Sequence, residues 1–237
     1  MSDFSIPADA LRSHVARMTD HFTDCLFAFE CEDTTTVTFP VSRLVLDPER
    51  FENDADEPMA ACGQGVLYQR GADGSVIRPT LSCARRRELL DRWYRPHHER
   101  ITAAVDDGLN RFGRVLIIDA HSFAAAPLPL DLNQLTPRPD ACIGTAGIHT
   151  PMELVDGALG WCREHEWSIG IDAPYSGTMV PLKHYGKTSA VLSIMIEINR
   201  SRYMTLEHWI PTPSERFEET RVFVAGLIRR LRELSTL

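Results

Sequence analysis

The residues most able to carry chemistry follow a short apolar run at residues 115–118. Its β-branched side chains predict a strand buried on both faces of an α/β sheet. Asp119, His121 and Ser122 come directly after it, and ligands bind at the carboxyl ends of strands in such sheets. A carboxylate two residues before an imidazole can fix its tautomer. The pattern indicates a metal ligand or general base at His121, or else a histidine that only hydrogen-bonds at a strand end.

A second unusual residue, Glu197, lies inside the apolar run of residues 194–198. A carboxylate between two isoleucines is costly to bury unless it is paired, bound to a metal or protonated. Burial raises the pKa of a carboxyl group, as a general base or acid working near neutrality requires. Glu197 is therefore a candidate for proton transfer.

Two further features involve charge. Asp20 and Asp24 are one helical turn apart, so both carboxylates would project from the same helix face, with His21 beside Asp24. This face is either an acidic or metal site or simply a solvated surface. Arg43 lies in a segment that otherwise favours burial, so it needs a partner, which could be Asp47, Glu49 or an anionic ligand.

A mononuclear zinc hydrolase would give each of these features a role. Zinc binds a few nitrogen and oxygen ligands and keeps one position for water, whose pKa it lowers. A nearby carboxylate can move the proton of that water to the leaving amine. An arginine can bind a substrate carboxylate through paired hydrogen bonds.

The elements that must position these residues alternate along the chain. Apolar periodicity predicts helices at residues 8–29, broken near Thr19, at 81–109, interrupted at Pro96, at 151–165 and at 214–234. Strands are expected at residues 34–39, 63–68, 115–118, 140–145, 168–171 and 191–198, with an Asp-Gly turn at 71–74. The order favours one α/β domain over residues 1–237, built as three layers around a sheet.

Composition excludes several classes of protein. A net charge of −8 argues against a nucleic-acid partner. The chain shows no apolar run long enough for a membrane span and no signal peptide, and its six cysteines form no Cys-x-x-Cys pair, so we expect a cytoplasmic protein with reduced thiols. Glycine-rich nucleotide motifs and a Gly-x-Ser-x-Gly elbow are also absent.

Several motifs in order give the chain a wider resemblance. They are Asp20-His-Phe-Thr-Asp24, Ser42-Arg-Leu-Val-Leu-Asp-Pro-Glu-Arg50, Gly63-Gln-Gly-Val-Leu-Tyr68, Tyr94-Arg-Pro-His-His98, Ile118-Asp-Ala-His-Ser122, Asp140-Ala-Cys-Ile-Gly-Thr145, Pro174-Tyr-Ser-Gly177 and Ile196-Glu-Ile-Asn-Arg200. Together they resemble the N-formylglutamate amidohydrolases, which are similar to zinc carboxypeptidases and aspartoacylases. The resemblance implies a zinc-exopeptidase-like (phosphorylase/hydrolase-like) α/β/α fold with a mixed central sheet. It also implies hydrolysis of N-formyl-L-glutamate to formate and L-glutamate in histidine degradation, with one zinc ion per chain.

The resemblance also implies roles for single residues. His121 is similar to a zinc ligand and Glu197 to the general base, and either Asp20 or Asp24 would be the carboxylate ligand. The substrate, a small anionic amino-acid derivative, would be bound by Arg43 and Arg200. Tyr68, His98 and Ser176 are expected to line the site.

The chain departs from the family at its start. The family opens with a strand and a Pro-His-Ser-Gly motif, and here Met1 stands about where that histidine belongs. His14 and His21 are candidates to replace this ligand, or else are exposed helix histidines. The alternative function is therefore a non-catalytic family member that lost the first zinc ligand and only binds a small acidic ligand.

Overall fold

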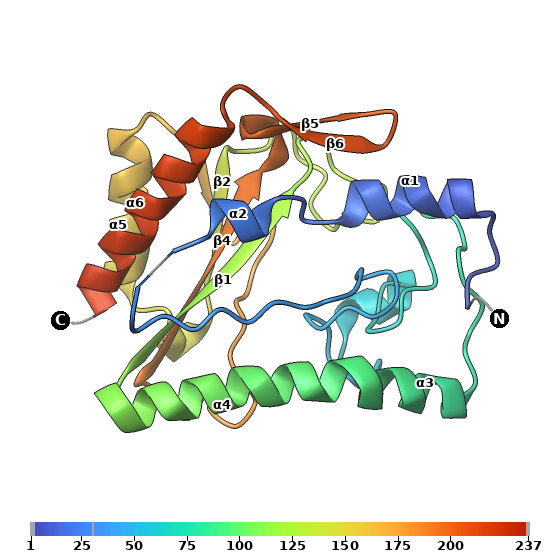
Figure 1. Ribbon diagram of the computed structural model, residues 1–237, viewed down its shortest axis with the longest axis horizontal. Helices are drawn as coiled ribbons and strands as arrows, with labels where there is room; N and C mark the ends of the chain where they lie inside the picture. The colour runs from blue at the N-terminus through green and yellow to red at the C-terminus, as the bar shows by residue number, and fades with distance from the viewer. Residues whose placement is uncertain (1–2, 30, 236–237) are drawn as a thin grey trace.

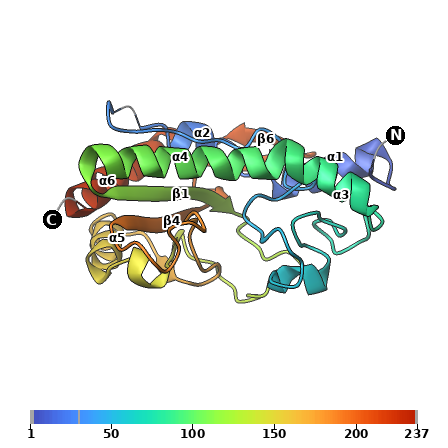
Figure 2. The same ribbon diagram turned by 90° about the horizontal axis from the view of Figure 1, so that it is seen from below.

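The computed structural model describes residues 3–29 and 31–235, which form helical layers around a mixed sheet (Figures 1 and 2). The sheet has the order β1-β4-β2-β3 and consists of β1 (Val115–Phe123), β2 (Ala141–Gly144), β3 (Ile169–Ile171) and β4 (Val191–Asn199). β4 runs parallel to β1 and antiparallel to β2, and β2 runs parallel to β3. The predicted α/β fold with a mixed sheet is thereby confirmed.

Helices and a hairpin surround this sheet. The helices are α1 (Ala8–Met18), α2 (Thr23–Leu26), α3 (Cys83–Leu89), α4 (Arg95–Phe112), α5 (Met152–Glu164) and α6 (Phe217–Ser235), with short turns η1 (Pro58–Cys62), η3 (Gly147–His149) and η4 (Arg200–Arg202). The strands β5 (Met204–Glu207) and β6 (Ile210–Pro213) form a separate antiparallel hairpin. In Figure 2, β1 and β4 lie between α4 and α5.

One face of the sheet is apolar except at Ser122, near the end of β1. Alternate residues of β4, from Leu192 to Ile198, point to this face and pack with α5 and α6, which lie side by side (Figure 1). Successive side chains of a strand point to opposite faces of the sheet, so the buried strand β4 contributes apolar side chains to both faces. Fully burying one isoleucine contributes about 1.5–3 kcal/mol, and this cluster forms the main core.

The opposite face changes character along the strands. Near its start, Val115, Ile117 and Val191 pack against α4. Further along, the strand register places two rows on this face. Asp119, Met195 and Gly144 form the first row, and the second contains His121, Glu197 and Cys142. The polar end of one sheet face therefore carries the candidate chemistry.

The long helical pattern of residues 81–109 is confirmed, with a local change before Pro96. Proline lacks the N–H that an α-helix needs. The helix accommodates this with a π-helical turn, η2 (Leu90–Tyr94), between α3 and α4. π-turns of this kind absorb one extra residue without ending a helix.

Four predictions about local structure are wrong. Residues 34–39 and 63–68 form no strand. Residues with high strand propensity form a strand only where a neighbouring strand pairs with them and one face is buried, and Thr34–Thr36 are exposed. The break expected near Thr19 is confirmed, since α1 ends at Met18, but Phe22 adopts a left-handed φ of 61° before α2, so the prediction that Asp20 and Asp24 share a helix face is wrong. β1 is an edge strand, only half-buried at residues 115–118, and it continues to Phe123, so Asp119 and His121 lie within it.

His97 in α4 gives the fold an acid-sensitive position. Its ring is buried against Phe39, its Nδ1 has no hydrogen-bond partner in the described part of the chain, and burial lowers its pKa from 6.5 to about 4. As the pH falls, the unfolded chain therefore takes up a proton on His97 before the folded protein does. The contribution of His97 to the free energy of unfolding is fully present above pH 6.5 and is lost as the pH falls towards 4.

We expect His97→Phe to remove this loss, which is on the order of 2–3 kcal/mol. Urea unfolding of both proteins at pH 7.5 and pH 4.5 measures it. An equal loss of stability in both proteins would exclude His97 as the cause.

Within the described ranges, no helix combines the length and apolar character needed to cross a membrane.

Candidate active site

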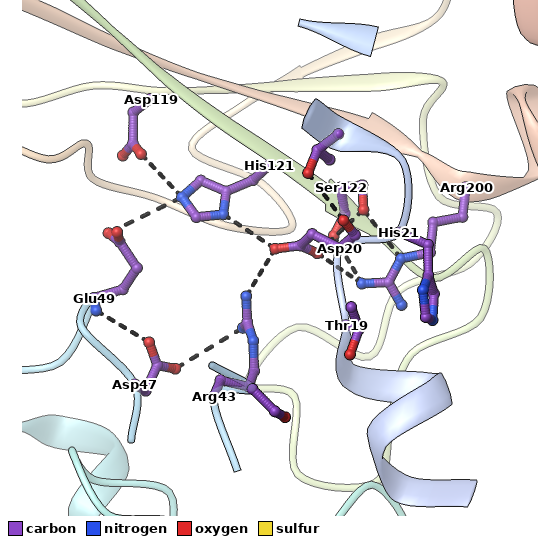
Figure 3. A network of polar contacts seen from close by, with 12 residues as sticks. Thr19, Asp20, His21, Arg43, Asp47, Glu49, Asp119, His121, Ser122 and Arg200 are labelled. Atoms are coloured by element: carbon purple, nitrogen blue, oxygen red, sulfur yellow. Dashed lines mark hydrogen bonds and ion pairs between the residues drawn. The ribbon is translucent and has the colours of Figure 1, made fainter. Parts of the chain in front are cut away.

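The ring of His121 lies at the centre of a buried polar network (Figure 3). Its Nδ1 lies 3.3 Å from Asp20 Oδ2, and its Nε2 lies 2.9 Å from Asp119 Oδ1 and 4.0 Å from Glu49 Oε2. Burial would lower the pKa of His121, but these carboxylates hold it well above its usual value. Without a bound cation, each ring nitrogen therefore carries a proton directed at a carboxylate.

On the Nδ1 side, Asp20 is fixed by two arginines. Arg43 donates to its Oδ2 at 2.8 Å, and Arg200 donates to its Oδ1 at 2.7 Å. Ser122 donates to the same Oδ1 at 3.1 Å. Burial alone would raise the pKa of Asp20, but Arg43, His121 and Arg200 hold it well below its usual range. Asp20 is therefore an ionised group that orients the ring.

On the Nε2 side, Asp119 and Glu49 face each other across the ring nitrogen. Asp119 Oδ2 accepts a hydrogen bond of 2.7 Å from the backbone N–H of Met179. Burial raises the pKa of Glu49 to about 8, assisted by the charge of Asp119. One donor atom from each of Glu49, Asp119 and His121 lies within 4.8 Å of the others.

The loop that carries Glu49 is held by two predicted site residues. Tyr68 donates to Asp47 Oδ2 at 2.7 Å, and Asp47 Oδ1 accepts from the backbone N–H of Glu49 at 3.0 Å. His98 Nε2 lies 3.0 Å from the carbonyl oxygen of Pro48. Burial raises the pKa of Tyr68 to about 12, so its hydroxyl remains a donor. Tyr68 and His98 therefore position the loop.

Glu197 pairs with His121 across β4 and β1, and its side chain is buried. Burial raises its pKa to about 7, partly opposed by the charge of His121. Its Oε2 is buried and finds no hydrogen-bond partner among the described residues. A native buried polar atom of this kind needs a reason, such as a proton, a ligand or a catalytic role.

The charges in this region leave room for a cation. The network contains six carboxyl groups, Asp20, Asp47, Glu49, Glu57, Asp119 and Glu197, against the three arginines Arg43, Arg50 and Arg200 and the ring of His121. Burial is the main cause of the raised pKa values of Glu49 and Glu197, and the charges of Asp119 and Asp20, respectively, add to it. One imidazole and two carboxylates form a donor set that fits a divalent metal with a position left for water.

The structure brings together most of the predicted site residues, and it places two aspartates on opposite sides of the His121 ring. Asp119, predicted to orient His121, contacts Nε2 beside Glu49, and Asp20, a predicted ligand, contacts Nδ1. Asp24 is exposed on α2, and Ser176 is exposed in its loop. Neither takes part in the described network.

The two histidines proposed as replacement ligands have structural contacts instead. His14 is buried and its Nδ1 accepts the N–H of Ala72 at 3.1 Å. His21 Nε2 lies 2.9 Å from the Ala16 carbonyl, and its ring points away from His121 (Figure 3). Met1 lies outside the described residues.

Sequence reasoning did not select two residues of this site, Glu49 and Arg50. The signal available was their place in Asp47-Pro-Glu-Arg50, directly after the buried residues Leu44 and Leu46. A tetrapeptide with three charged residues directly after an apolar segment indicates a loop that leaves the core.

Comparison with known proteins shows where this arrangement belongs. The family model described as FGase, N-formylglutamate amidohydrolase, matches residues 3–204. The chain belongs to this family. The resemblance drawn from the motifs is confirmed, and with it a hydrolase of the amidohydrolase kind.

Two solved structures share the fold. The N-formylglutamate amidohydrolase of Ralstonia eutropha JMP134 superposes with a TM-score of 0.76 at 24% identity, over 98% of this chain and 87% of that one. The gene product Atu2144 of Agrobacterium tumefaciens gives a TM-score of 0.60 at 16% identity, over 98% and 82%. At these identities the likeness concerns the fold alone. None of the curated proteins matches this chain significantly.

Proposed function

We propose that this protein is a zinc-dependent amidohydrolase that cleaves N-formyl-L-glutamate to formate and L-glutamate, a cytoplasmic step of histidine degradation. The observation that supports this most is the combination of three converging donors, Glu49, Asp119 and His121, with the unpartnered Glu197 in the neighbouring strand. Family membership supports the substrate class.

Glu49, Asp119 and His121 Nε2 would hold the metal. Zinc, when bound, polarises a carbonyl group and lowers the pKa of water. Asp20 then accepts from His121 Nδ1–H, which fixes the tautomer with Nε2 free for the ion. Arg43, Arg200 and Ser122 keep Asp20 ionised and in place for this task.

Glu197 is the proton carrier. It takes a proton from the water whose oxygen adds to the formyl carbon. When the C–N bond breaks, the same proton goes to the nitrogen of the leaving glutamate. A pKa of about 7 suits both transfers, because the group can accept and release a proton near neutrality.

Arg50 is the best placed cation for a substrate carboxylate. Arg43 and Arg200 are both engaged with Asp20 at 2.7–2.8 Å. Among the described residues Arg50 has only long side-chain contacts, 3.5 Å to the Tyr68 hydroxyl, 3.8 Å to Asp47 and 3.9 Å to Glu57, and its buried Nε has no hydrogen-bond partner there. Its donors therefore remain available for a ligand.

We expect Arg50→Met to raise KM for N-formyl-L-glutamate by about tenfold to a hundredfold with little change in kcat, because a charge-assisted hydrogen bond contributes roughly 1.5–3 kcal/mol. Steady-state kinetics measures both constants. The matched control is Arg92→Met, an exposed arginine of η2 that stacks on Trp93. Unchanged KM in Arg50→Met would exclude Arg50 from substrate binding.

The proposed function is tested by formate release. Purified protein supplied with zinc should hydrolyse N-formyl-L-glutamate, and chelation should abolish turnover until zinc is restored. N-acetyl and N-succinyl analogues should react more slowly, although an acyl pocket discriminates by only about 1–3 kcal/mol per methylene. Tight binding of uncleaved substrate without formate would overturn the enzymatic assignment and favour the non-catalytic alternative.

A further inference from the structure

Residues 172–180 pass over the polar half of the sheet face and contact the row that holds Asp119. The backbone N–H of Met179 donates to Asp119 Oδ2 at 2.7 Å, while Asp119 Oδ1 lies 2.9 Å from His121 Nε2. Asp119 is thus held between the ring on one side and a backbone amide on the other. Whatever fixes the Met179 amide also fixes the direction of this carboxylate.

Ser193 is the first residue that fixes this amide. It lies in β4 among apolar residues and is completely buried. Its hydroxyl donates to the carbonyl oxygen of Met179 at 2.8 Å and lies 2.7 Å from Thr178 Oγ1. A buried hydroxyl needs partners, and here both partners belong to the segment that passes over the site. Ser193 therefore ties that segment to the central strand.

Gly144 is the second. It lies in β2 beside Met195, in the same row as Asp119. A Cβ atom added at this position would lie 2.0 Å from the carbonyl oxygen of Gly177 and 2.5 Å from Met195 Cε. Only glycine lets the backbone of the segment approach the sheet this closely. The approach occurs two residues before Met179.

We propose that Ser193 and Gly144 are positioning residues for Asp119, acting through the backbone N–H of Met179. Neither touches the atoms that would react. The proposal rests on the proposed function in one respect, the role of Asp119 as a metal-binding group. It adds that residues 172–180 set the geometry of this group, and that two residues on separate strands hold the segment in place.

The test uses Ser193→Ala, with Ser193→Thr as the conservative variant. Amide hydrogen exchange at Met179 is measured by NMR in the metal-free protein, and zinc affinity by competition with a chromophoric chelator. We expect Ser193→Ala to speed exchange at Met179 about tenfold or more and to weaken zinc binding by about 10–100-fold. Ser193→Thr keeps the hydroxyl and should restore both values. Gly144→Ala should act in the same direction as Ser193→Ala.

Thr220→Val is the matched control. Thr220 is a buried hydroxyl in α6 that donates to the Arg202 carbonyl at 3.0 Å, away from the segment. Its loss should lower the free energy of unfolding without changing Met179 exchange or zinc affinity. Wild-type exchange at Met179 in Ser193→Ala, or equal weakening of zinc binding in Thr220→Val, would overturn the proposal. If the wild-type protein binds no zinc, the zinc dependence in the proposed function is wrong. The exchange rates at Met179 would still show whether Ser193 and Gly144 position its backbone N–H.

Discussion

Replacing Glu197 with glutamine should lower kcat for formate release by a factor of about 10²–10⁴ while zinc content stays the same. Glutamine has nearly the same shape and can occupy the same buried place in β4. It cannot accept a proton from water, so both proton transfers are lost. Because Glu197 is not among the three converging donors, the metal should be unaffected.

Stability provides an independent readout of the same variant. Burial raises the pKa of Glu197 to about 7 from an ordinary 4.5, so the folded protein keeps a proton that the unfolded chain has already released. The contribution of Glu197 to the free energy of unfolding of the metal-free wild type therefore falls as the pH rises from 4.5 to 7, opposite in sign to that of His97. In Glu197→Gln this contribution disappears. A variant with near wild-type kcat, or with this pH dependence intact, would contradict the role of Glu197.

Replacing His121 with alanine should weaken zinc binding by more than about a hundredfold and abolish turnover. Even the loss of an outer partner of a metal ligand costs about 10–100-fold, and His121 supplies the single nitrogen of the donor set. The change also leaves Asp20, Asp119 and Glu49 without the imidazole between them. Three carboxyl groups, of which Asp119 is buried and Asp20 and Glu49 are partly buried, then lack the positive ring between them and repel.

Chelator competition and metal analysis of the purified variant measure this effect. His21→Ala is the control, since His21 lies beside Asp20 in the chain but its Nε2 lies 2.9 Å from the Ala16 carbonyl and its ring points away from His121 (Figure 3). Circular dichroism should show that both variants fold. Stoichiometric zinc in His121→Ala would exclude His121 as a ligand and would shift attention to the carboxylates alone.

The sequence predicted the elements with strong periodicity and failed where a segment depends on distant partners. The strand β4, which carries Glu197, and the helix α5 were predicted correctly because the spacing of their apolar residues matches the positions that are buried. Residues 34–39 have strand-like composition but no neighbouring strand in the described structure. Propensity alone cannot supply a partner.

The site shows the same division. His121 and Glu197 were found because each is a polar residue in an apolar strand, which is a local anomaly. Glu49 was not, because its importance arises only when the loop after Leu46 meets β1. The same limit applies to Asp20 and Asp119, because sequence spacing does not show which ring nitrogen of a histidine faces which carboxylate.

The distribution of the buried apolar clusters indicates that the polar network around His121 also connects separate parts of the molecule. Most buried apolar residues from α1 to η2 form two small clusters, around Leu46 and Leu44, whereas Leu26 packs into the main core of the sheet. Asp20, Arg43 and Glu49 lie in this N-terminal part of the chain, whereas His121 lies in β1 and Arg200 begins η4 directly after β4. The ion pairs and hydrogen bonds among these residues therefore connect the N-terminal part of the chain to β1 and η4. The side chains proposed for the reaction therefore also hold the two parts together, so a substitution among them is expected to change both activity and stability.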